Sequence, residues 1–309
     1  MKPQVKWTIA ITVLVLFMFC LTGCGKSAEE INSEFSEILS DKATPKTMEK
    51  AEEYAEKYAK KLSADGATNM VAQLEDYLIQ YINTDRDDVQ VQALAAYFDK
   101  ESGEVDEDRI KDVDTKEYYE RLTKVHIHPV YFEDRVQLRI NYTTLNETFG
   151  AVIDPALSRL YEIKVWITDN PATKNASLQI GYDQLLERAL AVEELIDEYP
   201  DHVLIAEEVE WLYSTYLDLI MMGTTNTPIF DYDTGAFNEQ AEQAYRTFMK
   251  ENKATTIAWA LNEYFKYLES IDYTMNYKDS TTSKLFFDSC YGIRVAAEKR
   301  VFEQNELYE

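Results

Sequence analysis

The sequence predicts an α+β fold that is predominantly helical, with helical hairpins flanking a small antiparallel β-meander. Through most of the chain, apolar side chains recur every three or four residues, which places them on one face of a helix. One stretch, residues 136–142, instead alternates apolar and polar side chains, which is the period of a half-buried strand. The composition, 46% hydrophobic and 13% aromatic, supports a packed core in spite of a net charge of −25.

The first residues have the pattern of a signal peptide. Two lysines precede an apolar run over residues 7–21, and this run is shorter than the roughly 20 residues that a membrane-spanning helix needs. The run ends in Leu21-Thr22-Gly23-Cys24, which resembles the lipobox of bacterial lipoproteins. A simple secretory signal and an uncleaved membrane helix are the alternatives.

The lipobox resemblance implies how the protein is held at a membrane. In that family the thiol at the position of Cys24 receives a diacylglyceryl group, and a dedicated peptidase removes the residues before it, here residues 1–23. Two acyl chains anchor a protein stably where a single chain is marginal. We therefore expect a lipid-anchored protein on the extracytoplasmic face of the cell membrane, with Cys24 as the lipidation site.

The charge balance limits the classes of partner that the protein is expected to bind. The 56 acidic residues outnumber the 31 basic ones, and removal of residues 1–23 takes away two lysines and no acid. Phosphate binding needs clustered basic side chains, so we expect no nucleic-acid partner. An anionic membrane surface repels such a chain, which leaves the lipid on Cys24 as the membrane contact. A protein partner with basic character fits this charge.

The three cysteines predict no disulfide in the mature chain. Cys20 leaves with the signal and Cys24 carries the lipid, so Cys290 has no partner. Cys290 lies on an apolar helical stripe with Phe286 and Ile293, which indicates a core position rather than a nucleophile.

The chain is expected to divide into six segments. They are a signal peptide (1–23), a tether (24–43), an N-terminal helical segment (44–100), an acidic linker (101–121), a small antiparallel sheet (122–180) and a C-terminal helical domain (181–309).

The N-terminal helices are predicted from their start signals. Ser27 to Glu30 reads as a capping box, which puts some helix in the tether. Thr44-Pro45 combines a cap residue with Pro at the first helical position. That helix is expected to end at Asp65-Gly66, and a second apolar stripe over residues 71–82 completes a hairpin.

A third helix and a loop are expected next. Asp87 or Asp88 caps the helix, with a strand over residues 89–94 as the alternative. Residues 100–117 are acidic and poor in large apolar side chains, which is typical of a loop or linker.

The predicted sheet begins with the alternating residues 136–142. Residues 125–132 suggest the partner strand, with Glu133-Asp134 at the turn. Residues 148–153 and 160–167 are expected to form a second hairpin, and short connections favour an antiparallel meander of three to five strands.

The C-terminal residues return to helical spacing. Pro200-Asp201 separates the first two helices, Gly223 closes the second, and residues 224–237 form a loop. Helical stripes restart at Ala241 and at Ile257, and a last helix carries Cys290.

A faint internal repeat lies in this half. Residues 195–200 and 248–253 each stand between two helical stripes, so each copy is helix, break, helix. This is similar to helical-hairpin repeats of the tetratricopeptide kind, although the period is longer and the Trp-x-x-Leu-Gly pattern is absent. The resemblance implies stacked hairpins.

Stacked hairpins leave a concave face, and such faces usually bind peptides or protein segments. Tyr213, Tyr216, Tyr245 and Tyr264 are the candidate aromatic anchors, because Tyr supplies contact area at low entropic cost. The alternative is that all four are core residues, as aromatic side chains on helical stripes usually are.

Residues 231–242 open with the spacing of a calcium loop, with Glu242 at the twelfth position. Ala236 stands where an EF-hand loop needs Gly, so a turn feeding a helix capped by Asn238 is expected instead of a calcium site.

His126 and His128 lie two apart, which puts both imidazoles on one side of a strand. Two imidazoles can start a zinc site, but the third ligand available nearby is Glu133 or Asp134. We expect two ordinary histidines and no metal site.

No enzyme motif is present in the sequence. Gly-x-Ser-x-Gly, a phosphate-binding loop, a dinucleotide fingerprint and His-Glu-x-x-His are all absent. Acidic pairs such as Glu193-Glu194 and Glu207-Glu208 do not face one another on a helix. We expect a non-catalytic protein-binding or scaffold module without a cofactor. The alternatives are a solute-binding lipoprotein of a transporter and a cell-wall-acting enzyme.

Overall fold

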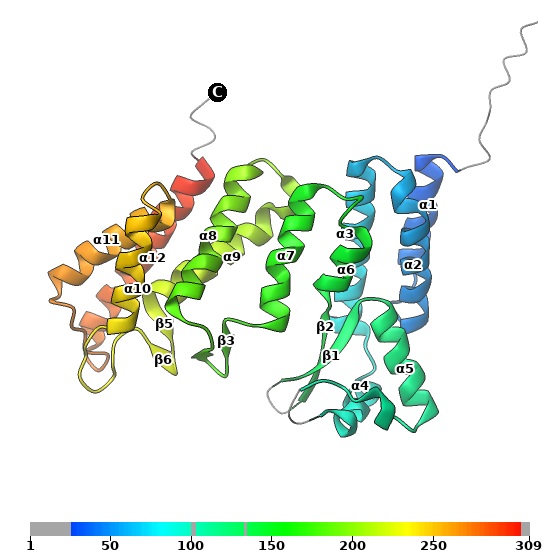
Figure 1. Ribbon diagram of the computed structural model, residues 1–309, viewed down its shortest axis with the longest axis horizontal. Coiled ribbons are helices and arrows are strands. Elements are labelled where there is room, and N and C mark those ends of the chain that lie inside the picture. Colours follow the sequence, from blue (N-terminus) through cyan, green and yellow to red (C-terminus); the bar gives the residue numbers. More distant parts are fainter. Residues whose placement is uncertain (1–25, 100–102, 133–134, 304–309) are drawn as a thin grey trace, which may run out of the picture.

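The computed structural model describes residues 26–99, 103–132 and 135–303. Over these residues the fold is predominantly helical, with three two-stranded antiparallel sheets. The predicted α+β class is therefore confirmed. Figure 1 shows the helices standing side by side along the long axis, from the N-terminal helices at one end to the C-terminal helices at the other.

The N-terminal half combines a helical layer with a lower lobe. Its elements are α1 (Ala28–Leu39), α2 (Pro45–Tyr58), α3 (Ala64–Gln80), α4 (Asp88–Ala93), α5 (Val113–Lys124), β1 (Ile127–Phe132), β2 (Arg135–Ile140), α6 (Tyr142–Phe149) and α7 (Pro155–Asp169). The β1–β2 hairpin, α4 and α5 hang below α1–α3 (Figure 1).

The predicted helix starts are confirmed. Ser27 and Glu30 form a capping box at α1, with Glu30 N donating to Ser27 Oγ at 3.2 Å. Thr44 caps α2 with Pro45 at its first position, and Asp87 caps α4. Each cap side chain accepts from backbone N–H groups that a helix leaves unpaired at its start.

Two boundaries near the N-terminus differ from prediction. Ile31, Phe35 and Ile38 of α1 are buried, so this part of the expected tether belongs to the core. Asp65-Gly66 does not end a helix but lies in the first turn of α3, which Ser63 caps by accepting from Gly66 N at 3.2 Å. Gly66 therefore does not mark a helix end, because Ser63 just before it starts a new helix.

The expected acidic linker is partly helical. Asp112 caps α5, and Tyr118 and Leu122 of that helix are buried. The Tyr118 hydroxyl lies 2.9 Å from the hydroxyl of Tyr81 in α3. A few apolar side chains one turn apart thus fix α5 to the core, although acidic composition favoured a loop.

The first predicted hairpin is confirmed. In the described strands, β1 pairs with β2 from Ile127↔Ile140 to Phe132↔Arg135, and Val136, Leu138 and Ile140 are buried. The predicted turn at Glu133-Asp134 lies outside the described residues. Tyr142 does not continue the strand, because Asn141 caps α6 at that point.

The second predicted hairpin, and with it the longer meander, is wrong. Residues 155–169 form α7, and residues 148–149 are the end of α6. Asp154 accepts from Ala156 N at 2.8 Å with Pro155 at the first helical position, which is a helix-start signal. The run from Leu160 to Ile167 is apolar on several sides of a helix, so its alternation was not diagnostic of a strand.

The C-terminal half consists of two helical hairpins, a long last helix and two small β-hairpins. The elements are β3 (Thr173–Lys174), β4 (Ser177–Leu178), α8 (Tyr182–Glu198), α9 (Val203–Met222), β5 (Gly223–Thr224), β6 (Thr227–Pro228), α10 (Glu239–Glu251), α11 (Thr256–Ser270) and α12 (Ser280–Glu303). Gly223, with φ of 69°, ends α9 as predicted. The pairs α8–α9 and α10–α11 have the predicted order of helix, break and helix, and α12 packs on α9 and α11.

Helix α7 joins the two halves through a buried charge cluster. The Lys164 ammonium donates to Glu75 of α3 at 2.6 Å and to Glu208 of α9 at 2.8 Å. Lys164 and Glu75 are both more than nine-tenths buried.

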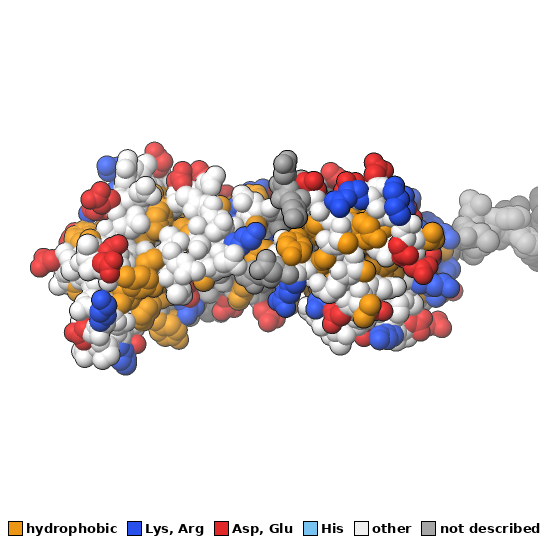
Figure 2. Space-filling view, turned by 90° about the horizontal axis from the view of Figure 1, so that it is seen from below, with side chains coloured by type: hydrophobic (Ala, Val, Ile, Leu, Met, Phe, Trp, Pro, Cys, Tyr) orange, Lys and Arg blue, Asp and Glu red, His pale blue; other side chains and the backbone are white. Residues whose placement is uncertain are grey.

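The surface mixes acidic and basic side chains, as the lower face in Figure 2 shows. On this face hydrophobic side chains gather at the end that holds the C-terminal helices (Figure 2). Leu285, Phe287, Tyr291 and Val295 of α12 are exposed. Helix α12 is thus apolar on more than its buried side.

Candidate functional site

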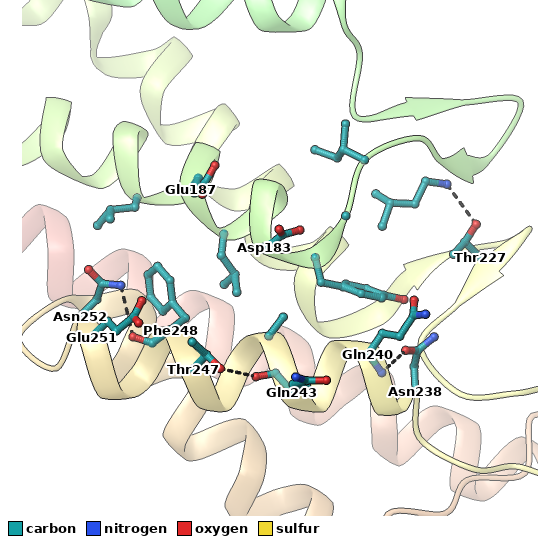
Figure 3. Close-up of a pocket in the computed structure, with 17 residues that line it drawn as sticks. Asp183, Glu187, Thr227, Asn238, Gln240, Gln243, Thr247, Phe248, Glu251 and Asn252 are labelled. Atoms are coloured by element: carbon teal, nitrogen blue, oxygen red, sulfur yellow. Dashed lines mark hydrogen bonds between the residues drawn. The ribbon is translucent and has the colours of Figure 1, made fainter.

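A hollow lies between α8 and α10. Its volume is about 570 Å³, and the two hairpin ends β4 and β6 close one end of it. Figure 3 shows the labelled side chains in two rows, with Asp183 and Glu187 on α8 opposite Gln240, Gln243 and Glu251 on α10. We call it the α8–α10 groove.

The charge of the α8–α10 groove is of one sign. Asp183, Glu187 and Glu251 line it, and no Lys, Arg or His does. None of the three carboxylates has a basic nitrogen of the described chain within 4.0 Å. These acids are therefore not neutralised by the protein itself.

The floor of the groove is apolar. Leu186 and Phe248 are buried, and Leu190 and Ala244 are partly buried between the two helices. Amide and hydroxyl groups of Gln240, Gln243 and Thr247 stand along the α10 side. Apolar floor, acidic rim and neutral polar wall together suit a ligand that has both an apolar and a cationic side.

Hydrogen bonds between the small hairpins fix the closed end. Leu178 N of β4 donates to Thr227 Oγ1 of β6 at 3.1 Å (Figure 3). Asn238 caps α10 by accepting from Gln240 N and Ala241 N, as predicted. The two small hairpins are thus joined to each other at the end of the groove where α10 begins.

Tyr182 leaves a polar group unsatisfied beside the groove. Its side chain lines the hollow and its ring packs edge-on against Tyr245 at 5.8 Å. The buried hydroxyl of Tyr182 has no hydrogen-bond partner in the described chain, and burial raises its pKa. Such a group usually binds water or a ligand.

The four predicted tyrosine anchors are core residues. Tyr213, Tyr245 and Tyr264 have no exposed surface and Tyr216 is 3% exposed, so none can reach a partner on the concave face. Their hydroxyls serve internal contacts, with Tyr245 donating to the Ile220 carbonyl at 2.5 Å and Tyr264 to the Met221 carbonyl at 2.6 Å. The helical stripes on which they lie face inward, and this corrects their assignment as binding residues.

The other sequence candidates have structural explanations. Asp231 accepts from Asp233 N, Thr234 N and the Thr234 hydroxyl, which makes a tight turn and lowers its pKa. Cys290 is fully buried as predicted, and burial raises the pKa of its thiol. Within the described ranges, no group of three or more His, Cys, Asp or Glu side chains is placed to hold a metal ion.

The two histidines do not form a pair on one strand. His126 precedes β1 with φ of 58°, and its ring lies 2.9 Å from both Glu52 and Thr144. His128 lies within β1, where burial lowers its pKa. The left-handed backbone at His126 turns its ring toward α2, so the strand spacing does not apply.

Sequence reasoning missed the three acids of the groove. Asp183 and Glu187 stand one turn apart on α8 without a basic neighbour between them, which costs an isolated helix a few tenths of a kcal/mol, about 0.2–0.5. That unrelieved repulsion was the available signal. Glu251 has no such signal, because only the tertiary structure brings α10 beside α8.

The searches against known proteins give no family. No protein-family model, curated protein or solved structure matches this chain. Among the described helices, none is both long and apolar enough to cross a membrane. Cys24, the predicted lipidation site, lies outside the described residues.

Proposed function

We propose that this protein is a membrane-anchored extracytoplasmic lipoprotein that binds a basic segment of a partner protein in the α8–α10 groove and catalyses no reaction. The observation that supports binding most directly is the lining of the groove, in which three carboxylates without basic partners surround an apolar floor.

The chemistry of the groove selects its ligand. Apolar side chains of an amphipathic segment cover the partly exposed Leu190 and Ala244, while Lys or Arg side chains on the same segment reach Asp183, Glu187 and Glu251. The net charge of −25 draws a cationic partner in from a distance, and this attraction weakens as salt rises. Binding is therefore expected to be faster and tighter at low ionic strength.

The test uses a labelled amidated peptide with Leu and Lys at amphipathic helical spacing, and the same peptide with Gln in place of Lys. Fluorescence anisotropy with the mature chain measures both. The Lys peptide is expected to bind and to weaken steeply with salt, and the Gln peptide to bind at least about tenfold more weakly. Equal binding of the two peptides contradicts the proposal.

A matched pair of variants locates the binding site. Glu187→Gln with Glu251→Gln removes two rim charges and is expected to weaken the Lys peptide about tenfold, as two exposed ion pairs of roughly 0.7 kcal/mol each would. Glu239→Gln with Glu269→Gln makes the same charge change at exposed acids that do not line the groove. If both pairs have the same effect, attraction is general and the groove is not the site.

Two assays address the alternative functions. A linear triamine is tested as a competitor of the Lys peptide. If the triamine displaces the peptide and has the higher affinity, the solute-binding lipoprotein is favoured. Turnover of purified wall fragments by the mature chain would favour the wall-acting enzyme.

The membrane anchor has its own test. Cys24→Ala is expected to leave an unlipidated precursor in a bacterial host, because this thiol is the acylation point in the resembled family. Labelled fatty acid still incorporated into the Cys24→Ala chain would show that the lipobox interpretation is wrong.

A further inference from the structure

A second hollow lies where the two halves of the molecule meet. Its volume is about 340 Å³, and residues of α3, β2, α7 and α9 line it. Ile82, Leu138 and Ile167 give it apolar walls. We call it the Arg139 cavity, because the positive charge of this residue distinguishes its lining from that of the α8–α10 groove.

Arg139 is a half-buried cation that has no ion-pair partner among the described residues. Its Nη1 donates to the Thr168 carbonyl at 2.9 Å, and its guanidinium carbon lies 4.7 Å from the centre of the Phe132 ring. No carboxylate oxygen of the described chain lies within 4.0 Å of the guanidinium, and Asp169 acts on it only from farther away. Burial lowers the pKa of Arg139, and the more distant Asp169 carboxylate opposes this shift.

The other charges of the cavity are already paired. Lys164 Nζ contacts Glu208 at 2.8 Å and Glu75 at 2.6 Å, and Lys164 is 6% exposed. One cation is thus shared between two carboxylates, so this cluster is formally negative and repels an anion that approaches its side. An anionic group therefore fits only on the Arg139 side of the cavity.

Trp211 stands at the rim on the α9 side. Its indole is 58% exposed, which is unusual for the largest apolar side chain next to an apolar hollow. A flat apolar body can pack against this ring and continue into the apolar walls.

We propose that the Arg139 cavity binds a small amphipathic anion, with a planar apolar body against Trp211 and the apolar walls and one carboxylate, sulfonate or phosphate group on the Arg139 guanidinium. This site is separate from the α8–α10 groove and selects the opposite charge. The two sites can therefore fail or hold independently of each other.

Two dyes of nearly the same shape test the proposal on the mature chain. The anionic probe is 8-anilinonaphthalene-1-sulfonate, and the neutral probe is N-phenyl-1-naphthylamine. Fluorescence titration of the wild type is expected to give saturable binding of both, with the sulfonate dye bound more tightly. A neutral dye that binds as tightly as the sulfonate dye overturns the proposal.

Variants place the dye in the cavity. Arg139→Gln is expected to weaken the sulfonate dye about tenfold and leave the neutral dye unchanged, since only the former has a charge to pair. Trp211→Ala is expected to weaken both dyes. Arg135→Gln, at an exposed arginine of the same strand that does not line the cavity, is the control and should change neither.

Each other outcome counts against the site. An Arg139→Gln chain that loses both dyes equally has lost the shape of the cavity, so the charge claim fails. An Arg139→Gln chain that keeps full affinity for the sulfonate dye places the dye elsewhere, for example on the exposed apolar residues of α12. Equal effects of Arg139→Gln and Arg135→Gln would indicate general attraction by positive charge.

Discussion

The two halves of the molecule bury a glutamate in different ways. In the N-terminal half, Glu75 of α3 accepts from the Lys164 ammonium at 2.6 Å and from the hydroxyls of Tyr142 at 2.8 Å and Tyr161 at 2.9 Å. The carboxylate is thus neutralised by a buried cation, and two tyrosines satisfy its remaining lone pairs.

In the C-terminal half, Glu193 of α8 is buried, and no basic side chain of the described residues forms an ion pair with it. It accepts from Thr256 N at 2.5 Å and Ile257 N at 2.9 Å, the first two residues of α11, and from the Tyr213 hydroxyl at 3.1 Å. The start of α11 provides unpaired N–H groups and the positive end of the helix dipole. Burial nevertheless raises the pKa of Glu193, because these dipoles do not replace the water that the carboxylate has lost.

The two halves should therefore differ in how much a single substitution near the buried glutamate destabilises them. An ion pair concentrates its compensation in one side chain, so one substitution leaves a bare charge in the core. A helix start spreads the compensation over several donors. The carboxylate can also avoid the desolvation free energy of a buried charge by taking up a proton. Four measurements test this contrast and the structural role of a buried tyrosine.

The largest effect is expected from Lys164→Met. This change leaves Glu75 as an unpaired buried charge, and removal of one partner of a buried pair typically costs about 3–5 kcal/mol. Urea denaturation measures the loss. The double variant Glu75→Met with Lys164→Met should recover most of it. A loss below about 1 kcal/mol in the single variant would show that the pair contributes little.

A smaller loss is expected from Glu193→Ala. Two N–H groups of α11 and the Tyr213 hydroxyl lose their acceptor, which should cost about 2–3 kcal/mol. The exposed neighbour is the control, since Glu194→Ala should stay within about 0.5 kcal/mol of wild type. If the two variants unfold at the same urea concentration, Glu193 does not stabilise α11.

Tyr264→Phe should cost about 1 kcal/mol, because the Met221 carbonyl loses a buried donor while the ring stays in place. Thermal unfolding measures this loss, with Tyr291→Phe as a control at a ring that is 59% exposed. Binding of the Lys peptide to the α8–α10 groove should not change. Weaker peptide binding in Tyr264→Phe at unchanged stability would restore this tyrosine as a binding residue.

The smallest expected effect is a pH slope from Glu193. Its pKa is raised in the folded state, so between the ordinary Glu value and the raised value the folded chain binds more protons than the unfolded chain. Stability contributed by Glu193 therefore falls as pH rises through this window and is level above it. The difference in unfolding free energy between wild type and Glu193→Gln should show this fall. If this difference rises with pH, the pKa of Glu193 is not raised in the folded state.

The sequence alone determined the parts of this protein that depend on neighbours along the chain. Cap residues such as Ser27, Thr44 and Asn238 mark helix starts because they bind N–H groups two or three positions ahead. The strand 135–140 was predictable because its alternation is short and strict. The helix over 155–169 was not recognised, although Asp154-Pro155 carried the signal, because its apolar residues also fit a strand.

Which face of each helix is exposed depends on the tertiary structure and not on local sequence. Tyr213, Tyr245 and Tyr264 lie on helical stripes that could face a groove or a core, and periodicity does not distinguish the two. The structure turns them inward and instead sets Asp183 and Glu187 of α8 opposite Glu251 of α10, two helices between which α9 and the β5–β6 hairpin lie in the chain. It likewise brings Arg139 and Trp211, from elements far apart in the chain, to the lining of one cavity. Contacts of this kind depend on how helices pack across the fold, and no local pattern of side chains encodes them.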